Sequence, residues 1–385
     1  MLTKITLENF KSFHEKTEID FNKTNYTFLP QNVADSGVLK GAVFVGANAS
    51  GKSNVLEAIK LLLDLLFSES DLHLQLYANF LNLNDPEKNF FKISYEFLIR
   101  NHKIEYQVQY FNKTNAFIEY LSIDGKELMW RVDEDAKSFL SDASGVAYQS
   151  DSIIKDGLFL RTLYFNTKFI ENEILQEWMQ FLSASIYYHQ ARTELKLYSA
   201  KELKTIYQYL KENGTEEFND FLSKYRFPHQ IDYYQGDSQK GGSNMIFFKR
   251  TLGANSYINM PEVYESTGNR ALIRMLHLFF VALSRNCMLI VDEFSSCLHN
   301  DLEELLMRHF MEKSKQSQIF IVTHSTNLLS NAILRPDQEY AVEFRKTGSS
   351  VKRFSSEQPR LAQNVEKMYV SGVFGGLPHY HETES

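Results

Sequence analysis

The stretch Gly41-Ala-Val-Phe-Val-Gly46-Ala-Asn-Ala-Ser-Gly51-Lys52-Ser53 decides the fold of this chain. Its second part matches the pattern G-x-x-x-x-G-K-[ST], whose small residues let successive backbone N–H groups wrap the phosphates of a nucleotide. An apolar, β-branched run predicts a buried strand over 41–46, and apolar residues at helical spacing predict a helix over 54–67. A glycine-rich loop between a strand and a helix N-terminus predicts a nucleotide site; a plain glycine-rich turn is the alternative.

Two residues of this loop have tasks that their positions predict. Lys52 is expected to reach the β- and γ-phosphates, and the Ser53 hydroxyl to bind Mg²⁺. A P-loop also needs a metal carboxylate at the end of a neighbouring strand, and Met288-Leu-Ile-Val-Asp292-Glu293 supplies one. Asp292 is expected to hold Mg²⁺ through water and Glu293 to polarise the attacking water. An acidic strand end that only caps the next element is the alternative.

Two further motifs are expected to contact phosphate. Ile319-Phe-Ile-Val-Thr-His324 is a second apolar strand with a polar end, which would bring His324 to the same sheet edge as a sensor of the γ-phosphate. A structural histidine is the alternative. Glu265-Ser-Thr-Gly268-Asn-Arg270 precedes a helix predicted over 268–284 and could bind an anion at that helix N-terminus. An ordinary N-cap by Ser266 is the alternative.

The rest of the chain predicts a mixed architecture. Polar and apolar residues alternate over 4–10 and 18–21 and again between 90 and 165, which is typical of strands. From 169 to 226 the apolar residues recur at helical spacing. We therefore expect an α/β fold with an N-terminal antiparallel β layer, a mixed or parallel core sheet, and a β-meander plus a helical insertion between P-loop and signature. The expected parts are 1–165 with the P-loop and meander, a helical insertion lobe at 166–228, and the remainder of the nucleotide core at 229–385.

The order of motifs carries a resemblance to a known group. The motifs are Leu7-Glu-Asn-Phe-Lys-Ser-Phe13, the early P-loop, Ser266-x-Gly268, Asp292-Glu293 and Thr323-His324-Ser325. Together they resemble the ABC-type ATPases of the SMC/RecF/OLD group. Leu298-His299 and the closing stretch 364–378 are similar to compact bacterial ATPases of anti-phage and abortive-infection systems. The resemblance covers about 1–66 and 230–380, whereas the middle of the chain has no matching signature.

The resemblance implies ATP and Mg²⁺ as ligands and assigns a role to each motif. Asp292 would be the metal carboxylate, Glu293 the catalytic base and His324 the switch histidine. Ser266 and Gly268 would form the signature that closes over ATP bound to a second protomer, so a homodimer or higher homo-oligomer is expected, which hydrolysis would separate. The remaining residues expected at the nucleotide are Lys11, Ser12, Gly46, Asn48, Gly51, Lys52, Ser53 and Asn54.

The chain also departs from the group's pattern. The signature has Thr267 where a small residue is more typical, and Asn269-Arg270 follows it. The glutamine that couples the metal to the inserted domain in this group has no unique counterpart. Gln107, Gln109, Gln190 and Gln230 all remain candidates.

The spacing of the motifs narrows the expected function. The long segment between Lys52 and Asp292 lacks a sustained heptad, which argues against a long SMC-type coiled coil. The stretch after His324 is too short for the C-terminal nuclease domain of OLD proteins. We therefore expect a sensor, scaffold or regulatory subunit of anti-phage defence that controls a separate effector, such as a TOPRIM or HNH nuclease. A RecF-like repair ATPase that binds DNA directly and a slow ATP-dependent structural switch are the alternatives.

Composition limits the possible partners. The 385 residues carry a net charge of −7, which argues against nucleic-acid binding over the whole surface but leaves a local patch or a partner protein possible. Two cysteines cannot build a disulfide framework. No apolar run is long enough to span a membrane, and we see no secretory signal, so we expect a cytoplasmic protein without membrane association.

Three other segments have a functional and a simpler interpretation. The predicted hairpin 339–354 holds four cations that could touch DNA, although a solvated charged turn is simpler. Tyr187, Tyr188 and His189 could stack on bases, but buried aromatics are simpler. The tail from His379 to Glu382 is expected to be a frayed terminus.

Overall fold

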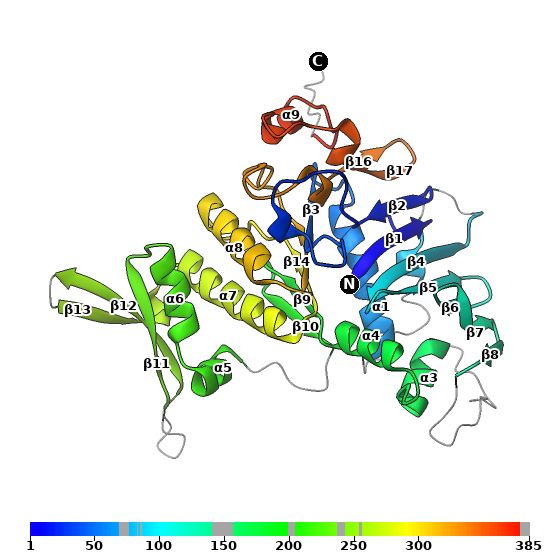
Figure 1. Cartoon of the computed structure of the whole chain (residues 1–385), viewed down its shortest axis with the longest axis horizontal. Helices are drawn as coiled ribbons and strands as arrows, with labels where there is room; N and C mark the ends of the chain where they lie inside the picture. The colour runs from blue at the N-terminus through cyan, green and yellow to red at the C-terminus, as the bar shows by residue number, and fades with distance from the viewer. Residues whose placement is uncertain are drawn as a thin grey trace.

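Two seven-stranded sheets and one three-stranded sheet organise the computed structural model of the chain (Figure 1). The structure describes residues 1–68, 77–82, 84, 87–140, 157–198, 205–236, 243–253 and 256–377, so the predicted frayed tail lies outside the described residues. No helix within the described part of the chain is both long enough and apolar enough to cross a membrane.

The core sheet has the order β10-β9-β14-β15-β3-β16-β17. Its five central strands are parallel, and β10 and β17 are antiparallel edges. The bounds are β3 (Gly41–Val45), β9 (Ile186–His189), β10 (Glu194–Leu197), β14 (Met288–Asp292), β15 (Gln318–Val322), β16 (Glu339–Arg345) and β17 (Gly348–Arg353). Every residue of β3, β14 and β15 is buried, as expected for a parallel sheet covered on both faces.

Helices cover the two faces of this sheet. Phe44 packs into the same apolar cluster as helix α1 (Lys52–Phe67), whereas Val43 packs with α7 (Thr267–Arg285) and α8 (Asn300–Lys313). Successive residues of a strand point to opposite faces, so the strand is anchored on both sides. This arrangement fixes the P-loop at the carboxyl edge of the sheet.

The second sheet is antiparallel and has the order β2-β1-β4-β5-β6-β7-β8. Its face packs on α1 together with α3 (Phe159–Thr167) and α4 (Glu173–Ser183), so α1 lies between the two large sheets. The N-terminal β layer and the meander are both confirmed, and the pairing of β1 with β4 makes them one sheet. The bounds are β1 (Leu2–Glu8), β2 (Thr17–Asp20), β4 (Phe90–Ile99), β5 (His102–Phe111), β6 (Ala116–Ile123), β7 (Lys126–Val132) and β8 (Asp135–Ser138).

A smaller unit projects from the core, at the left of Figure 1. It consists of α5 (Ile206–Asn213), α6 (Glu216–Lys224), β11 (His229–Tyr234), β12 (Met245–Gly253) and β13 (Ser256–Pro261). At the other end of the chain, α9 (Val365–Val370) lies near β16 and β17 (Figure 1).

The expectation of a helical lobe over 166–228 requires a correction. Strands β9 and β10 lie inside this segment, and β9 pairs in parallel with β14 within the core sheet. In addition, α3 begins at Phe159, before the expected boundary. A four-residue strand such as β9 has too little local pattern to be recognised, because its pairing with β14 determines its structure. The division of the chain into three parts stays a prediction.

Candidate nucleotide-binding site

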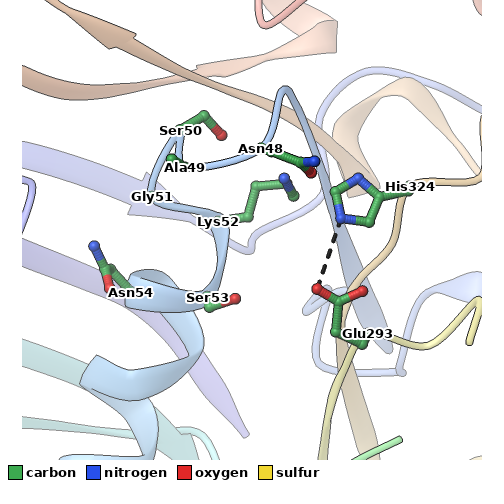
Figure 2. Close-up of a pocket in the computed structure, with 9 residues that line it drawn as sticks. All are labelled: Asn48, Ala49, Ser50, Gly51, Lys52, Ser53, Asn54, Glu293 and His324. Carbon is green, nitrogen blue, oxygen red and sulfur yellow. Dashed lines mark ion pairs between the residues drawn. The ribbon is translucent and has the colours of Figure 1, made fainter. Parts of the chain in front are cut away.

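A cavity of about 630 Å³ opens at the carboxyl edge of the core sheet. The loop between β3 and α1 forms one wall, and residues just after β14 and β15 form the other (Figure 2). The side chains of Lys52, Ser53, Glu293 and His324 converge on this space, as the motif order predicts. The lining residues are Asn48, Ala49, Ser50, Gly51, Lys52, Ser53, Asn54, Glu293 and His324.

The backbone of the loop requires glycine at two positions. A Cβ on Gly46 would lie 2.3 Å from the carbonyl oxygen of Val342 in β16. A Cβ on Gly51, which has φ +99°, would lie 2.4 Å from the hydroxyl oxygens of both Ser12 and Ser349. The loop therefore packs against neighbouring strands so closely that side chains are excluded. Gly46 does not line the cavity, so it shapes the loop from behind.

Lys52 lies folded back onto its own loop. Its Nζ donates hydrogen bonds to the carbonyl oxygens of Gly46 at 3.0 Å and Ala47 at 2.7 Å. Burial lowers the pKa of Lys52, while the charges of Glu293 and Asp292 oppose this change. A buried ammonium group that donates to carbonyl oxygens strongly attracts an anion such as a phosphate.

Ser53 and Asp292 form the candidate metal site. The Ser53 hydroxyl donates to Oδ1 of Asp292 at 3.0 Å, and the backbone N–H of Glu293 donates to the same oxygen at 3.0 Å. Asp292 is 4% exposed, and burial raises the pKa of its carboxyl. Hard oxygen donors beside a buried carboxylate suit Mg²⁺, since the ion would compensate the buried charge. These two residues therefore fit the predicted metal.

Glu293 and His324 face each other across the cavity. Nε2 of His324 lies 3.6 Å from Oε1 of Glu293 (Figure 2), and both side chains are partly exposed. Glu293 adopts φ +57°, a left-handed conformation that is uncommon outside glycine. The backbone N–H of His324 donates to Oγ of Ser295 at 3.4 Å, which links the loops that follow β15 and β14. The predicted base and the predicted switch histidine are thus brought together.

The four glutamines considered for coupling the metal to the inserted domain lie in different parts of the structure. Gln190 follows β9 at the carboxyl edge, where its backbone N–H donates to the carbonyl oxygen of Asp292 at 2.9 Å. Its side-chain nitrogen donates to the carbonyl oxygen of Ser296 at 3.1 Å, and its Oε1 is buried without a partner among the described residues. The other candidates lie on β5 and β11, in different sheets. Only Gln190 lies beside the predicted metal carboxylate.

Lys11 and Ser12 lie behind the loop and do not line the cavity. The Lys11 ammonium group pairs with Glu57 of α1 and lies 5.3 Å from the centre of the Phe80 ring. Ser12 Oγ accepts a hydrogen bond from the side chain of Asn54 at 2.7 Å. Ser12 is therefore connected to the nucleotide loop through Asn54, and direct contact of either residue with ATP stays a prediction.

The signature residues also lie outside the cavity. Ser266 caps α7, since its Oγ accepts from the backbone N–H of Asn269 at 3.2 Å. The preceding Glu265 is held by two contacts from Arg250 of β12, at 2.7 and 2.8 Å. The N-cap alternative is therefore correct for Ser266, and its role toward another protomer stays a prediction. Sequence patterns gave no signal for the Glu265–Arg250 pair, because it joins separate elements.

Two contacts of the loop were not predicted. Ser349 Oγ, in β17, donates to the carbonyl oxygen of Ser50 at 2.6 Å. The carbonyl oxygen of Gly376 accepts from the backbone N–H of Ala47 at 2.7 Å. The closing stretch was singled out only by resemblance, and nothing local in it indicates that it reaches the P-loop.

For the basic hairpin and for the tyrosines of β9, the contacts favour the simpler interpretations. In the basic hairpin, Lys352 pairs with Glu357 at 2.6 Å, Arg345 pairs with Glu343 at 2.8 Å, and Arg353 donates to the carbonyl oxygen of Asp337 at 2.8 Å. Tyr187 and Tyr188 are buried, and burial raises the pKa of each. Three of the four cations of the hairpin thus have partners within the chain, and both tyrosine side chains are buried.

Comparison with solved structures agrees with this geometry. The SMC head domain from Thermotoga maritima matches at TM-score 0.51 with 16% identity, over 91% of this chain and 97% of the other. An Smc head bound to the C-winged helix domain of ScpA matches at TM-score 0.52 with 14% identity, over 91% and 96%. An Smc head with an extended coiled coil, bound to the C-terminal domain of ScpA derived from Pyrococcus furiosus, matches at 0.50 with 14% identity, over 91% and 95%. The fold is that of an SMC/RecF-like ABC-type ATPase head.

A protein-family model matches most of the sequence. Residues 42–330 match the model of a family described as "AAA domain, putative AbiEii toxin, Type IV TA system". The match spans the P-loop motif, Ser266-x-Gly268, Asp292-Glu293 and His324. The chain belongs to this family of AAA domains. None of the curated protein sequences matches it.

Proposed function

We propose that the chain is an Mg²⁺-dependent ATPase that hydrolyses ATP to ADP and phosphate. The observation that supports this most is the convergence of a buried lysine, a serine–aspartate pair and a glutamate–histidine pair on one cavity. P-loop enzymes position these groups around the γ-phosphate, where catalysis consists mainly of alignment and charge stabilisation.

In the proposed mechanism, water attacks the γ-phosphate in line with the leaving oxygen. Glu293 accepts a proton from this water, while Lys52 exchanges its carbonyl partners for phosphate oxygens and His324 stabilises charge on the γ-phosphate. Ser53 and Asp292 would hold Mg²⁺, which supplies charge neutralisation between the phosphates. We assign Gln190, which lies beside Asp292, as the glutamine that would couple metal binding to the rest of the chain.

Glu293→Gln tests this mechanism most directly. Without the base, we expect hydrolysis to fall by at least about a hundredfold while ATP binding is retained, as measured by phosphate release and by calorimetry. Glu312→Gln, which changes a surface acid paired with Lys224 at 2.8 Å, is the matched control and should leave the rate unchanged. Hydrolysis by Glu293→Gln at the wild-type rate would contradict the assignment.

We further propose that the ATPase works in the cytoplasm as the regulatory subunit of a bacterial anti-phage complex and controls a separate effector, such as a TOPRIM or HNH nuclease. The description of its family, which names a putative AbiEii toxin of a type IV TA system, supports a role in such systems. Co-purification from the native operon, with ATP and with Glu293→Gln, would identify the effector. Salt-dependent DNA binding by the chain alone would instead favour the RecF-like alternative.

A further inference from the structure

Glu303 is a buried acid that the proposed mechanism leaves without a task. It lies in the first turn of α8 and is 0% exposed. Neither of its carboxyl oxygens makes a hydrogen bond of regular geometry to a residue that the structure describes. An unsatisfied carboxyl group in the interior is costly, so its presence requires an explanation.

The surroundings of Glu303 connect it to the switch histidine. Its carboxyl lies near the hydroxyl groups of Thr323 and Ser325, which both favour its ionised form, but burial dominates and raises its pKa to about 7. Thr323 and Ser325 flank His324 in the chain. The Ser325 hydroxyl is itself buried without a partner among the described residues. The Ser325 hydroxyl therefore lies close to the Glu303 carboxyl, one residue away from His324 in the chain.

The loop itself is braced on its other sides. The Thr323 hydroxyl accepts from the backbone N–H of Ser325 at 3.0 Å, and the backbone N–H of Thr323 donates to the carbonyl oxygen of Phe44 at 3.2 Å. The backbone N–H of His324 reaches Ser295 at 3.4 Å, a long contact. Since Thr323 and Ser325 flank His324, a shift of their hydroxyl groups would move the backbone that carries the His324 side chain.

We propose that Glu303 is a positioning residue, which holds the Thr323–Ser325 loop through their hydroxyl groups and so sets where His324 meets Glu293 and the γ-phosphate. This inference rests on the proposed ATPase function. It differs from a purely structural role, because removing a buried carboxyl group also removes its desolvation cost, so stability can be kept while alignment is lost. Loss of positioning lowers turnover even when the fold is intact.

Kinetics of Glu303→Leu test the proposal. We expect kcat to fall about tenfold with KM for ATP within about twofold, since the interaction acts on alignment rather than on nucleotide binding. Glu303→Gln keeps the shape and a hydrogen-bonding end and should restore most of the lost kcat. Glu304→Gln, an acid one residue further along α8, is the matched control. Unchanged kcat in Glu303→Leu would overturn the proposal.

A double-mutant cycle shows whether Glu303 acts through His324. In a His324→Ala background, Glu303→Leu should cause little further loss, because the group it positions is gone. Fully additive losses would contradict the proposal. Thermal unfolding of each variant verifies that the fold is intact. If Glu303→Leu does not fold, Ser325→Ala carries the test: it removes one of the two hydroxyl groups near Glu303 and should lower kcat in the same way, and an unchanged kcat would overturn the proposal.

A readout without hydrolysis separates this inference from the proposed function. The His324 ring resonance, assigned by its absence in His324→Ala, can be followed by NMR in the nucleotide-free protein. Glu303→Leu should shift this resonance and Glu304→Gln should not; an unmoved resonance in Glu303→Leu would overturn the positioning role. A wild-type protein without ATPase activity would count against the proposed function, while the resonance would still decide the role of Glu303.

Discussion

At the scale of single residues, the nucleotide loop is arranged for a ligand that completes it. Lys52 is buried among carbonyl groups and its pKa is lowered by burial. Asp292 is buried with its pKa raised by the same cause. The two groups thus carry opposite charges that burial disfavours, and a phosphate with its metal ion would stabilise both.

Lys52→Met should abolish this stabilisation. We expect ATP affinity to fall at least about tenfold, since one charged partner of the phosphates is lost, and titration calorimetry measures it. Lys315→Met is the control, because Lys315 is exposed and lines a different cavity. Equal affinity of Lys52→Met and wild type would remove Lys52 from the site.

Gly51→Ala should deform the loop by crowding. Its new methyl group would meet two hydroxyl oxygens at 2.4 Å, so we expect a cost of more than ~1 kcal/mol beyond backbone strain alone, and weaker ATP binding. Gly125→Ala is a matched control, because Gly125 also has a left-handed φ but no atom within 4 Å of the added carbon. Thermal unfolding of both variants separates crowding from strain.

At the scale of elements, the sequence predicts what local patterns encode. The strands and helices around the P-loop, Asp292 and His324 are strongly periodic and lie where predicted. The site could be assembled from them because parallel strands share a carboxyl edge. Strand β9 and the pairing of β1 with β4 were missed, since both depend on partners distant in the chain.

Buried histidines hold the projecting unit against the core helices. His277 of α7 contacts Tyr209 of α5 with ring centres 5.2 Å apart, and His309 of α8 contacts Phe221 of α6 at 5.1 Å. Burial lowers the pKa of each histidine to about 4. The unfolded chain would bind protons near pH 6.5, so the stabilising contribution is present above that pH and is lost as the pH falls toward 4.

His309→Phe tests this pH dependence. It keeps an aromatic ring but removes the titrating group, so its free energy of unfolding should fall less than that of wild type between pH 7 and pH 5. Urea unfolding at both pH values measures the difference. Acids whose pKa is raised by burial, such as Glu303, instead add stability as the pH falls. Because both proteins contain these acids, only the difference between variant and wild type isolates the contribution of His309. Identical changes in both proteins would contradict the histidine role.

At the scale of the whole molecule, the signature and the cavity lie apart in one chain. Neither Ser266 nor Gly268 lines the cavity, and we propose that they meet the nucleotide of a second protomer. The sequence predicted this only through resemblance, because no local pattern tells whether two motifs meet within a chain or between chains.

Ser266→Arg should therefore prevent assembly without preventing ATP binding. We expect Glu293→Gln with ATP and Mg²⁺ to form a dimer or larger oligomer, and the Ser266→Arg/Glu293→Gln double variant to stay monomeric, as measured by light scattering. Calorimetry should show that the monomer still binds ATP. An oligomer that persists in the double variant would place the interface elsewhere.

The contact between Ala47 and Gly376 also has a consequence for biosynthesis. Segments near both ends of the chain brace the same loop, Ser12 through Asn54 and Gly376 directly. The loop therefore has all its supports only after translation has passed Gly376. Prematurely terminated products that lack residues 364–377 should bind ATP poorly, so incomplete polypeptides would not compete with the finished protein for nucleotide.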